Sequence, residues 1–220
     1  MLMRLQPWIS TITCGQNNTG ETVAALTADR VDHLGGNGVG LVGRNDICMV
    51  ISNLSAGGAE RVFSQLANAW AAEERRIAVV TFSDAKTDFY QLSPRIQRIS
   101  VGGLTPSRGP IGTIAANIRR LGALRRAFKA SGAPRVLSFT GSMNALTVLA
   151  AWRLGLRVCI SERNDPARQS LGRVWDFMRR RTYPMADRVT ANSHGALASL
   201  ARFVPAEKLD YVPNPIAQAR

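Results

Sequence analysis

Short continuous runs of hydrophobic residues alternate along this chain with longer segments in which hydrophobic positions recur every three or four residues. Such runs are typical of buried parallel strands, whereas the wider spacing is typical of helices that bury one face. The runs predict strands near 47–51, 77–82, 96–101, 136–139, 158–161, 188–191 and 209–212. The spaced segments predict helices near 62–74, 111–128, 143–154, 171–178 and 196–203.

Strands that alternate with helices indicate βαβ units, which build a parallel sheet with helices on both faces. Because crossovers between parallel strands are right-handed, we expect an α/β fold with a Rossmann-like, doubly wound parallel sheet. Residues 1–45 lack both periodicities, so we expect an irregular, disordered extension there. Within it, residues 38–43 match G-x-G-x-x-G. We reject that match as a dinucleotide site because the strand follows it instead of preceding it.

The composition is that of a globular protein, with 45% hydrophobic and 20% charged residues. The net charge of +13 favours an anionic partner, namely nucleic acid, an acidic membrane surface or a phosphorylated substrate. An ordinary arginine-rich solvated surface explains the charge equally well, and both interpretations stay open. The three cysteines form no Cys-x-x-Cys or Cys/His cluster, which predicts neither a metal site nor a disulfide framework. With no signal peptide and no long apolar run, we expect a cytoplasmic protein.

Ligands of open α/β sheets bind beyond the carboxyl ends of the strands, so the loops there are the candidates for chemistry. Gly57 and Gly58 lie between the first strand and the first helix, where backbone N–H groups and the helix dipole favour a phosphate. Many tight turns of this kind use glycine for geometry alone, and Glu60 in the first helical turn suits the dipole without any ligand. Both interpretations stay open until the other loops are considered.

A second polar loop follows the fifth strand and contains Glu162, Arg163 and Asn164. Such a loop is suited to sugar hydroxyls and phosphates, because an arginine binds an anion through two parallel hydrogen bonds. The alternative is a surface ion pair between Glu162 and Arg163. Ser193 ends the sixth strand, where it is either a binding residue or the cap of the next helix.

Five segments, in this order, resemble the N-terminal domain of family-4 glycosyltransferases, which are retaining enzymes of the GT-B fold. The segments are Ile51-Ser52-Asn53-Leu54 with Gly57-Gly58-Ala59-Glu60-Arg61-Val62, Ser161-Glu162-Arg163-Asn164-Asp165-Pro166, Tyr183-Pro184-Met185-Ala186-Asp187-Arg188-Val189, Ala191-Asn192-Ser193, and Tyr211-Val212-Pro213-Asn214-Pro215-Ile216. The resemblance runs from about Asp46 to Ile216. It implies a Rossmann-like domain at 46–212 and the start of an interdomain linker at 213–220, so that the donor-binding domain is missing from this chain.

The resemblance also implies an acceptor-binding half of an enzyme that makes cell-envelope polysaccharides or lipid-linked oligosaccharides. Gly57 and Gly58 would face the donor diphosphate, and a sugar would pass from a nucleotide sugar to the acceptor with retention. Neither a metal nor another cofactor is expected, and no catalytic residue is assigned. Many members place a histidine in the loop after the fourth strand. This chain has none there, and Asn144 is the candidate that would contact the sugar instead.

The expected partners are therefore a nucleotide sugar, a lipid-linked or saccharide acceptor and a separate donor-binding domain. Arginine clusters at 118–129 and 173–181 indicate an anionic membrane surface as a further partner. The protein would then bind peripherally to the inner face of the membrane. No nucleic acid is expected, since no recognised binding motif occurs. A non-catalytic acceptor- or lipid-binding module that works with a separate donor-binding subunit stays open as the alternative. A dinucleotide oxidoreductase is disfavoured because the glycines after the first strand have the wrong spacing.

Overall fold

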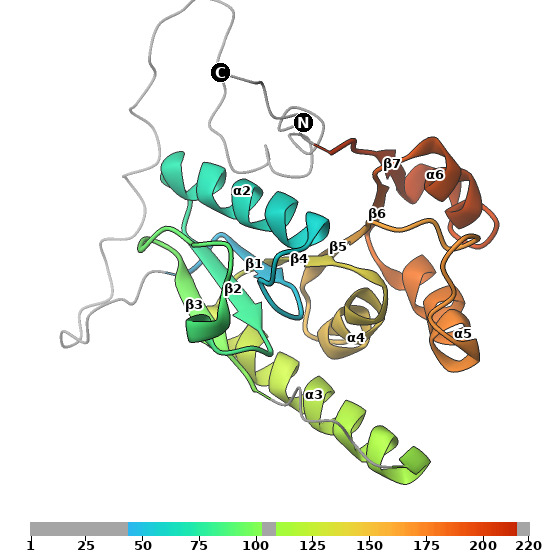
Figure 1. Ribbon diagram of the computed structural model, residues 1–220, viewed down its shortest axis with the longest axis horizontal. Coiled ribbons are helices and arrows are strands. Elements are labelled where there is room, and N and C mark those ends of the chain that lie inside the picture. Colours follow the sequence, from blue (N-terminus) through green and yellow to red (C-terminus); the bar gives the residue numbers. More distant parts are fainter. Residues whose placement is uncertain (1–43, 103–108, 215–220) are drawn as a thin grey trace, which may run out of the picture. The chain divides into compact units, whose positions relative to one another are not determined.

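The computed structural model describes residues 44–102 and 109–214 (Figure 1). The extension expected at 1–45 lies outside the described residues except for its last two positions, as do residues 215–220 of the expected linker. Asn45 is buried, and its side-chain amide donates to the Ser131 carbonyl (2.8 Å) and to Gln97 Oε1 (2.6 Å). The packed part of the chain therefore includes Asn45.

The described residues build one seven-stranded sheet in which every pair of neighbouring strands is parallel. The strand order is β3-β2-β1-β4-β5-β6-β7. The strands are β1 (Ile47–Val50), β2 (Ile77–Thr81), β3 (Gln97–Ser100), β4 (Arg135–Phe139), β5 (Arg157–Glu162), β6 (Arg188–Ala191) and β7 (Leu209–Tyr211). Each lies within two residues of its expected position, and the prediction of a Rossmann-like doubly wound sheet is confirmed.

Helices cover both faces of the sheet. They are α2 (Gly58–Ala72), α3 (Gly109–Ser131), α4 (Gly141–Ala151), α5 (Arg173–Thr182) and α6 (His194–Leu200). In Figure 1, α2 lies on one side of the strands and α3, α4 and α5 lie on the other. Short 3-10 turns occupy η2 (Ala85–Thr87), η3 (Tyr183–Met185) and η4 (Ala206–Lys208).

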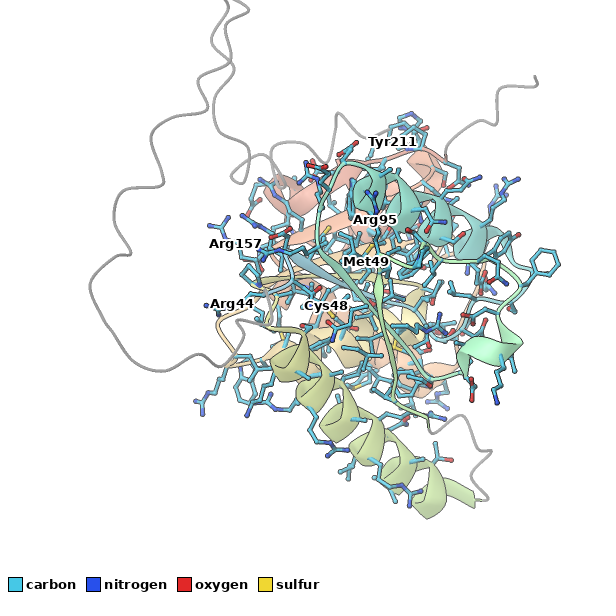
Figure 2. The ribbon with its side chains drawn as sticks, turned by 90° about the vertical axis from the view of Figure 1, so that its left-hand side faces the viewer. Arg44, Cys48, Met49, Arg95, Arg157 and Tyr211 are labelled. Atoms are coloured by element: carbon cyan, nitrogen blue, oxygen red, sulfur yellow. The ribbon has the colours of Figure 1, made fainter. Side chains whose placement is uncertain are left out.

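The core is built on the central strands, whose residues are buried on both faces. Cys48 and Met49 of β1 are fully buried, whereas Arg44, Arg95 and Arg157 are exposed (Figure 2). All four residues of β1 and all five of β2 are buried, which explains their continuous apolar runs.

Two helices bury less of their apolar stripes than their sequences predict. In α3, Leu124 and Phe128 are buried as expected, but Ile114 and Ile118 are 61% and 63% exposed. Figure 1 shows the reason: the N-terminal part of this long helix extends beyond the other elements. In α5, Val174 is likewise exposed, whereas Trp175 packs against the core.

The order in which strands are added to the sheet reverses at β1, while all strands stay parallel. From β1 the chain passes to β2 and β3 on one side, and then crosses through α3 to β4 and the remaining strands on the other. The switch point therefore lies between the carboxyl ends of β1 and β4, where ligands of such sheets bind. The Gly57–Gly58 turn and Thr140 follow these two strand ends.

Candidate functional site

The Gly57–Gly58 turn begins α2 directly after β1. Gly57 has an ordinary extended backbone (φ −107°, ψ 163°), and its carbonyl accepts the Arg61 N–H at 3.0 Å. A Cβ atom at Gly57 would collide with the Glu60 carboxylate, whereas one at Gly58 would meet nothing within 4 Å. The turn thus holds one carboxylate at the helix N-terminus, which the dipole favours, and leaves open space beside Gly58.

The turn after β4 is tightly packed and has an unusual backbone. Thr140 has φ +73° and ψ 144°, a conformation that β-branched residues rarely adopt. A Cβ at the next residue, Gly141, would collide with Leu171 and lie 3.0 Å from Arg179 Nη2. Side chains from the β5–α5 loop and from α5 therefore approach the backbone at the start of α4, and strained backbone of this kind clusters at functional sites.

A buried carboxylate organises the loop that follows β5. Glu162 is fully buried, and its Oε1 accepts the backbone N–H groups of Arg163 (3.1 Å) and Asn164 (3.3 Å). Its Oε2 accepts the Tyr183 hydroxyl at 2.6 Å and lies 3.6 Å from Arg179 Nε. Both oxygens are thus paired, as a buried charge requires, and Glu162 fixes the direction of the loop.

Tyr183 joins this carboxylate to the start of α4. Asn144 donates from Nδ2 to the Tyr183 hydroxyl oxygen (3.3 Å) and to the Ser161 carbonyl (3.0 Å). Burial, with the neighbouring Glu162 carboxylate, raises the pKa of Tyr183 well above its ordinary value, so the hydroxyl stays protonated. Asn144 and Glu162 are fully buried in this conformation. Their direct contact with a ligand stays a prediction.

Arg163 is a cation held in place on several sides. Its Nη1 donates to Asn214 Oδ1 at 3.0 Å, and its Cζ lies 4.4 Å from the centre of the Phe139 ring. Asn192 Nδ2 donates to the Arg163 carbonyl at 3.2 Å, while Arg163 Nε is buried without a hydrogen-bond partner. Burial lowers the pKa of Arg163 to about 10, so the group stays charged at neutral pH.

The aromatic ring under Arg163 also contacts α2. Phe139 packs edge-to-face on Phe63, with ring centres 5.3 Å apart. The helix that begins at Gly58 and the loop that holds Arg163 are therefore linked through one aromatic pair on the same face of the sheet.

The remaining candidates lie at exposed positions. Asn164 is exposed beside Arg163, and Ser193 is exposed after β6. Ser193 Oγ accepts the Ala196 N–H at 3.1 Å, which confirms the helix-cap interpretation; its contact with a ligand stays a prediction. His194, the first residue of α6, stacks on Tyr211 with ring centres 4.3 Å apart.

Three contributors to this site were not singled out in the sequence. Arg179 belongs to the arginine cluster at 173–181, which we expected at a membrane surface, yet its side chain is only 4% exposed. Its spacing of three residues from Asp176, with which it pairs at 3.4 Å, is the one local signal of a partner. Tyr183 and Asn214 reach their partners across 21 and 51 residues, which local pattern does not reveal.

The described residues contain no group of three or more His, Cys, Asp or Glu side chains placed to hold a metal ion. In the same part of the chain, no helix is both long and apolar enough to cross a membrane. Cys48 and Cys159 are free and buried, and burial raises the pKa of each thiol to about 12.

Residues 57–215 match the family model described as a glycosyl transferase 4-like domain. Over 165 residues the chain is 30% identical to GalNAc-alpha-(1->4)-GalNAc-alpha-(1->3)-diNAcBac-PP-undecaprenol alpha-1,4-N-acetyl-D-galactosaminyltransferase of Campylobacter jejuni. That match covers 74% of this chain and 44% of the relative.

Two solved structures share the fold at low sequence identity. The lipopolysaccharide outer core galactosyltransferase WaaB, in its apo form, is 12% identical with a TM-score of 0.61, over 77% of this chain and 45% of that one. UDP-N-acetylglucosamine 2-epimerase from Rickettsia bellii is 10% identical with a TM-score of 0.57, over 78% and 45%. These likenesses concern the fold alone. The chain spans about half the length of the proteins that it matches.

Proposed function

The chain belongs to the glycosyl transferase 4-like domain family, and from this premise we propose that it is the acceptor-binding half of a retaining glycosyltransferase. In this proposal a sugar passes from a nucleotide sugar to a lipid-linked or polysaccharide acceptor. The name of the Campylobacter relative describes transfer to an undecaprenol-linked saccharide, which supports a lipid-linked acceptor for this chain too.

The observation that carries the proposal is the placement of Gly58 and Arg163 on one face of the sheet, at its carboxyl edge. Gly58 offers the open N-terminus of a 15-residue helix beside the switch point, a suitable place for the donor diphosphate. Arg163 offers a fixed cation two strands away, directly after β5. One group would stabilise the departing diphosphate, and the other would orient the acceptor.

On the acceptor side we assign direct contacts to Arg163, Asn164 and Ser193. The pair Asn144 and Glu162 would act mainly by holding that loop, because both are fully buried, whereas Arg163 keeps 9% of its surface exposed. Direct contact of these two with a sugar would require the Tyr183 hydroxyl to move from its bond to Glu162.

The reaction step proposed is displacement on the face from which the diphosphate leaves, so that the anomeric configuration is retained. The acceptor hydroxyl loses its proton to the leaving phosphate while its oxygen bonds to the anomeric carbon. This half would contribute position and positive charge, and the proposal assigns it no metal or other cofactor.

A second Rossmann-like domain, in the same polypeptide or in another, would bind the nucleotide sugar. The coverage of 44% and 45% of the matched proteins supports this division of labour. We also propose peripheral contact with an anionic membrane surface through α3 and α5, where exposed apolar side chains adjoin arginines.

The test is a transfer and binding assay on the 220-residue chain with UDP- and GDP-sugars and undecaprenyl-diphosphate-linked saccharides. We expect the chain to bind the acceptor without turnover. Arg163→Gln should weaken that binding by about tenfold, because a buried, preoriented cation is lost. Arg95→Gln, at an exposed position just before β3 (Figure 2), is the charge-matched control.

Two results would contradict the proposal. Turnover by the chain alone would place a complete donor site within these 220 residues, against the assigned division. Equal acceptor binding by Arg163→Gln and the unchanged chain would remove Arg163 from the acceptor site. Binding without turnover, followed by turnover on addition of a donor-binding domain, separates the enzyme half from a purely binding module.

A further inference from the structure

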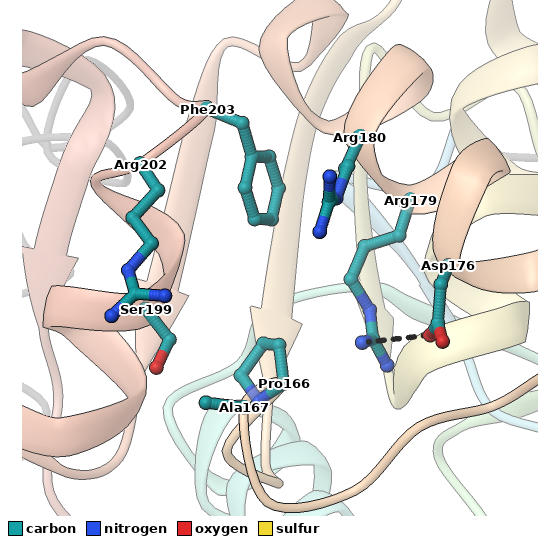
Figure 3. Close-up of a pocket in the computed structure, with 8 residues that line it drawn as sticks. All are labelled: Pro166, Ala167, Asp176, Arg179, Arg180, Ser199, Arg202 and Phe203. Carbon is teal, nitrogen blue, oxygen red and sulfur yellow. Dashed lines mark hydrogen bonds and ion pairs between the residues drawn. The ribbon is translucent and has the colours of Figure 1, made fainter.

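A cavity of about 230 Å³ lies between α5, α6 and the loop that follows β5 (Figure 3). Sites for drug-sized ligands usually measure about 300–1,000 Å³, so this cavity suits a single small group. The side chains that matter for its chemistry are Asp176, Arg179, Arg180, Ser199, Arg202 and Phe203.

The lining of this cavity is strongly basic, with three guanidinium groups against one carboxylate. Figure 3 shows Arg179 and Arg180 on the wall formed by α5, and Arg202 facing them from the end of α6. Arg180 and Arg202 are exposed and form no hydrogen bond or ion pair with another described side chain. Arg180 helps to lower the pKa of Asp176, and Arg202 that of Asp165, but a ligand that binds these two arginines displaces no hydrogen bond between described side chains.

The one lining carboxylate is already engaged. Asp176 accepts the Ser170 hydroxyl and the Leu171 N–H (3.1 Å), and it pairs with Arg179 at 3.4 Å. These hydrogen bonds lower the pKa of Asp176, and the bond from Ser170 has the largest effect. Ser199 donates its hydroxyl proton to Asp165 at 2.7 Å, so the arginines are the donors left for a ligand.

Arg179 gives the cavity a built-in, fixed donor. Its side chain is only 4% exposed, and its Nε is buried without a hydrogen bond, 3.6 Å from Glu162 Oε2. A guanidinium held by burial loses little freedom when it binds, which favours binding of a planar or tetrahedral oxyanion. The Phe203 ring supplies an apolar part of the cavity wall.

We propose that this cavity binds the phosphoryl group of a phosphorylated ligand through Arg179, Arg180 and Arg202. Three guanidinium groups on opposite walls match the several terminal oxygens and the double charge of a phosphoryl group. This site goes beyond the proposed sugar transfer. It does not depend on that transfer, because the experiment that tests it measures anion binding and not sugar transfer.

The cavity is also connected to the proposed acceptor loop. Arg179 pairs with Glu162, whose other oxygen holds the N–H groups of Arg163 and Asn164. An anion in the cavity competes with Glu162 for the positive charge of the fixed Arg179 guanidinium, which weakens this pair and changes the surroundings of those two amides. Binding of an anion in the cavity should therefore change the NMR signals of the backbone amides of residues 163–164.

The experiment titrates inorganic pyrophosphate into the 220-residue chain, followed by calorimetry and by amide NMR signals. We expect R180Q/R202Q to weaken binding by at least about tenfold, since two charge-assisted donors are lost. The control R95Q/R126Q removes the same charge at exposed positions outside the cavity and should bind like the unchanged chain. The Arg163 and Asn164 amides should shift on titration in the control and not in R180Q/R202Q.

Vesicles distinguish a lipid-borne phosphate from a free one. Phosphatidic acid vesicles carry a terminal phosphomonoester, whereas phosphatidylglycerol vesicles of matched charge do not. Tighter binding to the former than to the latter, with the difference removed by pyrophosphate, supports the site with a lipid source. Equal binding to both kinds of vesicle, together with pyrophosphate binding, supports it with a soluble source. Equal pyrophosphate binding by R180Q/R202Q and R95Q/R126Q, or no binding by any chain, overturns the proposal.

Discussion

Tyr183 connects three parts of the site that are far apart in the sequence. Its hydroxyl donates to Glu162 at 2.6 Å and accepts from Asn144 at 3.3 Å, and its ring lies at the start of η3. A buried carboxylate that loses one donor keeps its desolvation penalty, which typically costs about 1–3 kcal/mol. The geometry of the Arg163 loop therefore depends on one phenolic hydroxyl.

We predict that Tyr183→Phe lowers the free energy of unfolding by about 1–3 kcal/mol at neutral pH. The folded-state pKa of Tyr183 is raised, so its contribution is complete below the unfolded value of about 10 and declines as pH rises above it. The difference between the unchanged chain and Tyr183→Phe should thus shrink between about pH 10 and 11. Urea unfolding at a series of pH values measures it.

Tyr211→Phe is the matched control, because the Tyr211 side chain is partly exposed and donates no hydrogen bond to another described residue. Its unfolding free energy should follow that of the unchanged chain at every pH. A Tyr183→Phe difference that is absent at neutral pH, or that grows above pH 10, would show that the hydroxyl does not stabilise Glu162.

At this scale the sequence revealed more about the loops than about their supports. The loop at 162–164 could be found because polar residues follow a buried strand. Arg179 could not be found from the sequence, because it looks like its exposed neighbours Arg180 and Arg181. Tyr183 could not be found either, because its partner Glu162 lies 21 residues away. Only the packing of α5 against α4 decides which arginine of that run is buried.

Among the elements, α3 and α5 stand apart because each exposes apolar residues next to arginines. Ile114 and Ile118 of α3 are more than half exposed, and so are Val174 and Phe177 of α5. Helices with this distribution bind at membrane surfaces when their basic residues meet anionic headgroups. The periodicity predicted both helices, but how far each extends past the sheet depends on the tertiary structure.

We predict that V174S/F177S reduces binding of the chain to anionic phosphatidylglycerol vesicles by at least about tenfold. Each exposed apolar side chain that enters the interface contributes roughly 1.5–3 kcal/mol when fully buried, and less when partly so. Sedimentation with vesicles measures the change. Raised salt should weaken binding of the unchanged chain, since the arginine contribution is screened.

Phe89→Ser is the matched control, because Phe89 is 65% exposed but lies between η2 and β3, away from α3 and α5. It should bind vesicles like the unchanged chain. If V174S/F177S also binds vesicles like the unchanged chain, α5 does not contact the membrane, and Val174 and Phe177 have no role in membrane binding.

For the whole molecule, the parallel sheet was predicted from the alternation of strands and helices more than from any single residue. Right-handed crossovers and continuous apolar runs predict the parallel sheet, and all seven strands were found near their expected positions. The limits of the folded part are harder to predict. Asn45 looks like loop sequence, yet it is buried against Ser131 and Gln97, which lie more than 50 residues away.

This observation leads to a prediction about where the fold begins. A chain that starts at Arg44 should unfold at the same urea concentration as the full chain, because the sequence pattern predicts no packed element before that residue. A chain that starts at Ile47 should lose about 3–6 kcal/mol, roughly 0.5–1 kcal/mol for each of the six hydrogen bonds of Asn45 and Asp46 that disappear. Those bonds join Asp46 to Arg76 as well as Asn45 to Ser131.

The two shortened chains control for each other, since they differ by three residues and share the rest of the domain. Equal stability of both would mean that the bonds of Asn45 and Asp46 contribute nothing. A loss already present in the chain that starts at Arg44 would assign the first 43 residues to the fold, against the sequence pattern. If the chain that starts at Arg44 is the more stable of the two, the cooperatively folding unit begins at Arg44. The residues just before β1 then join it to the end of α3 and to the start of β2.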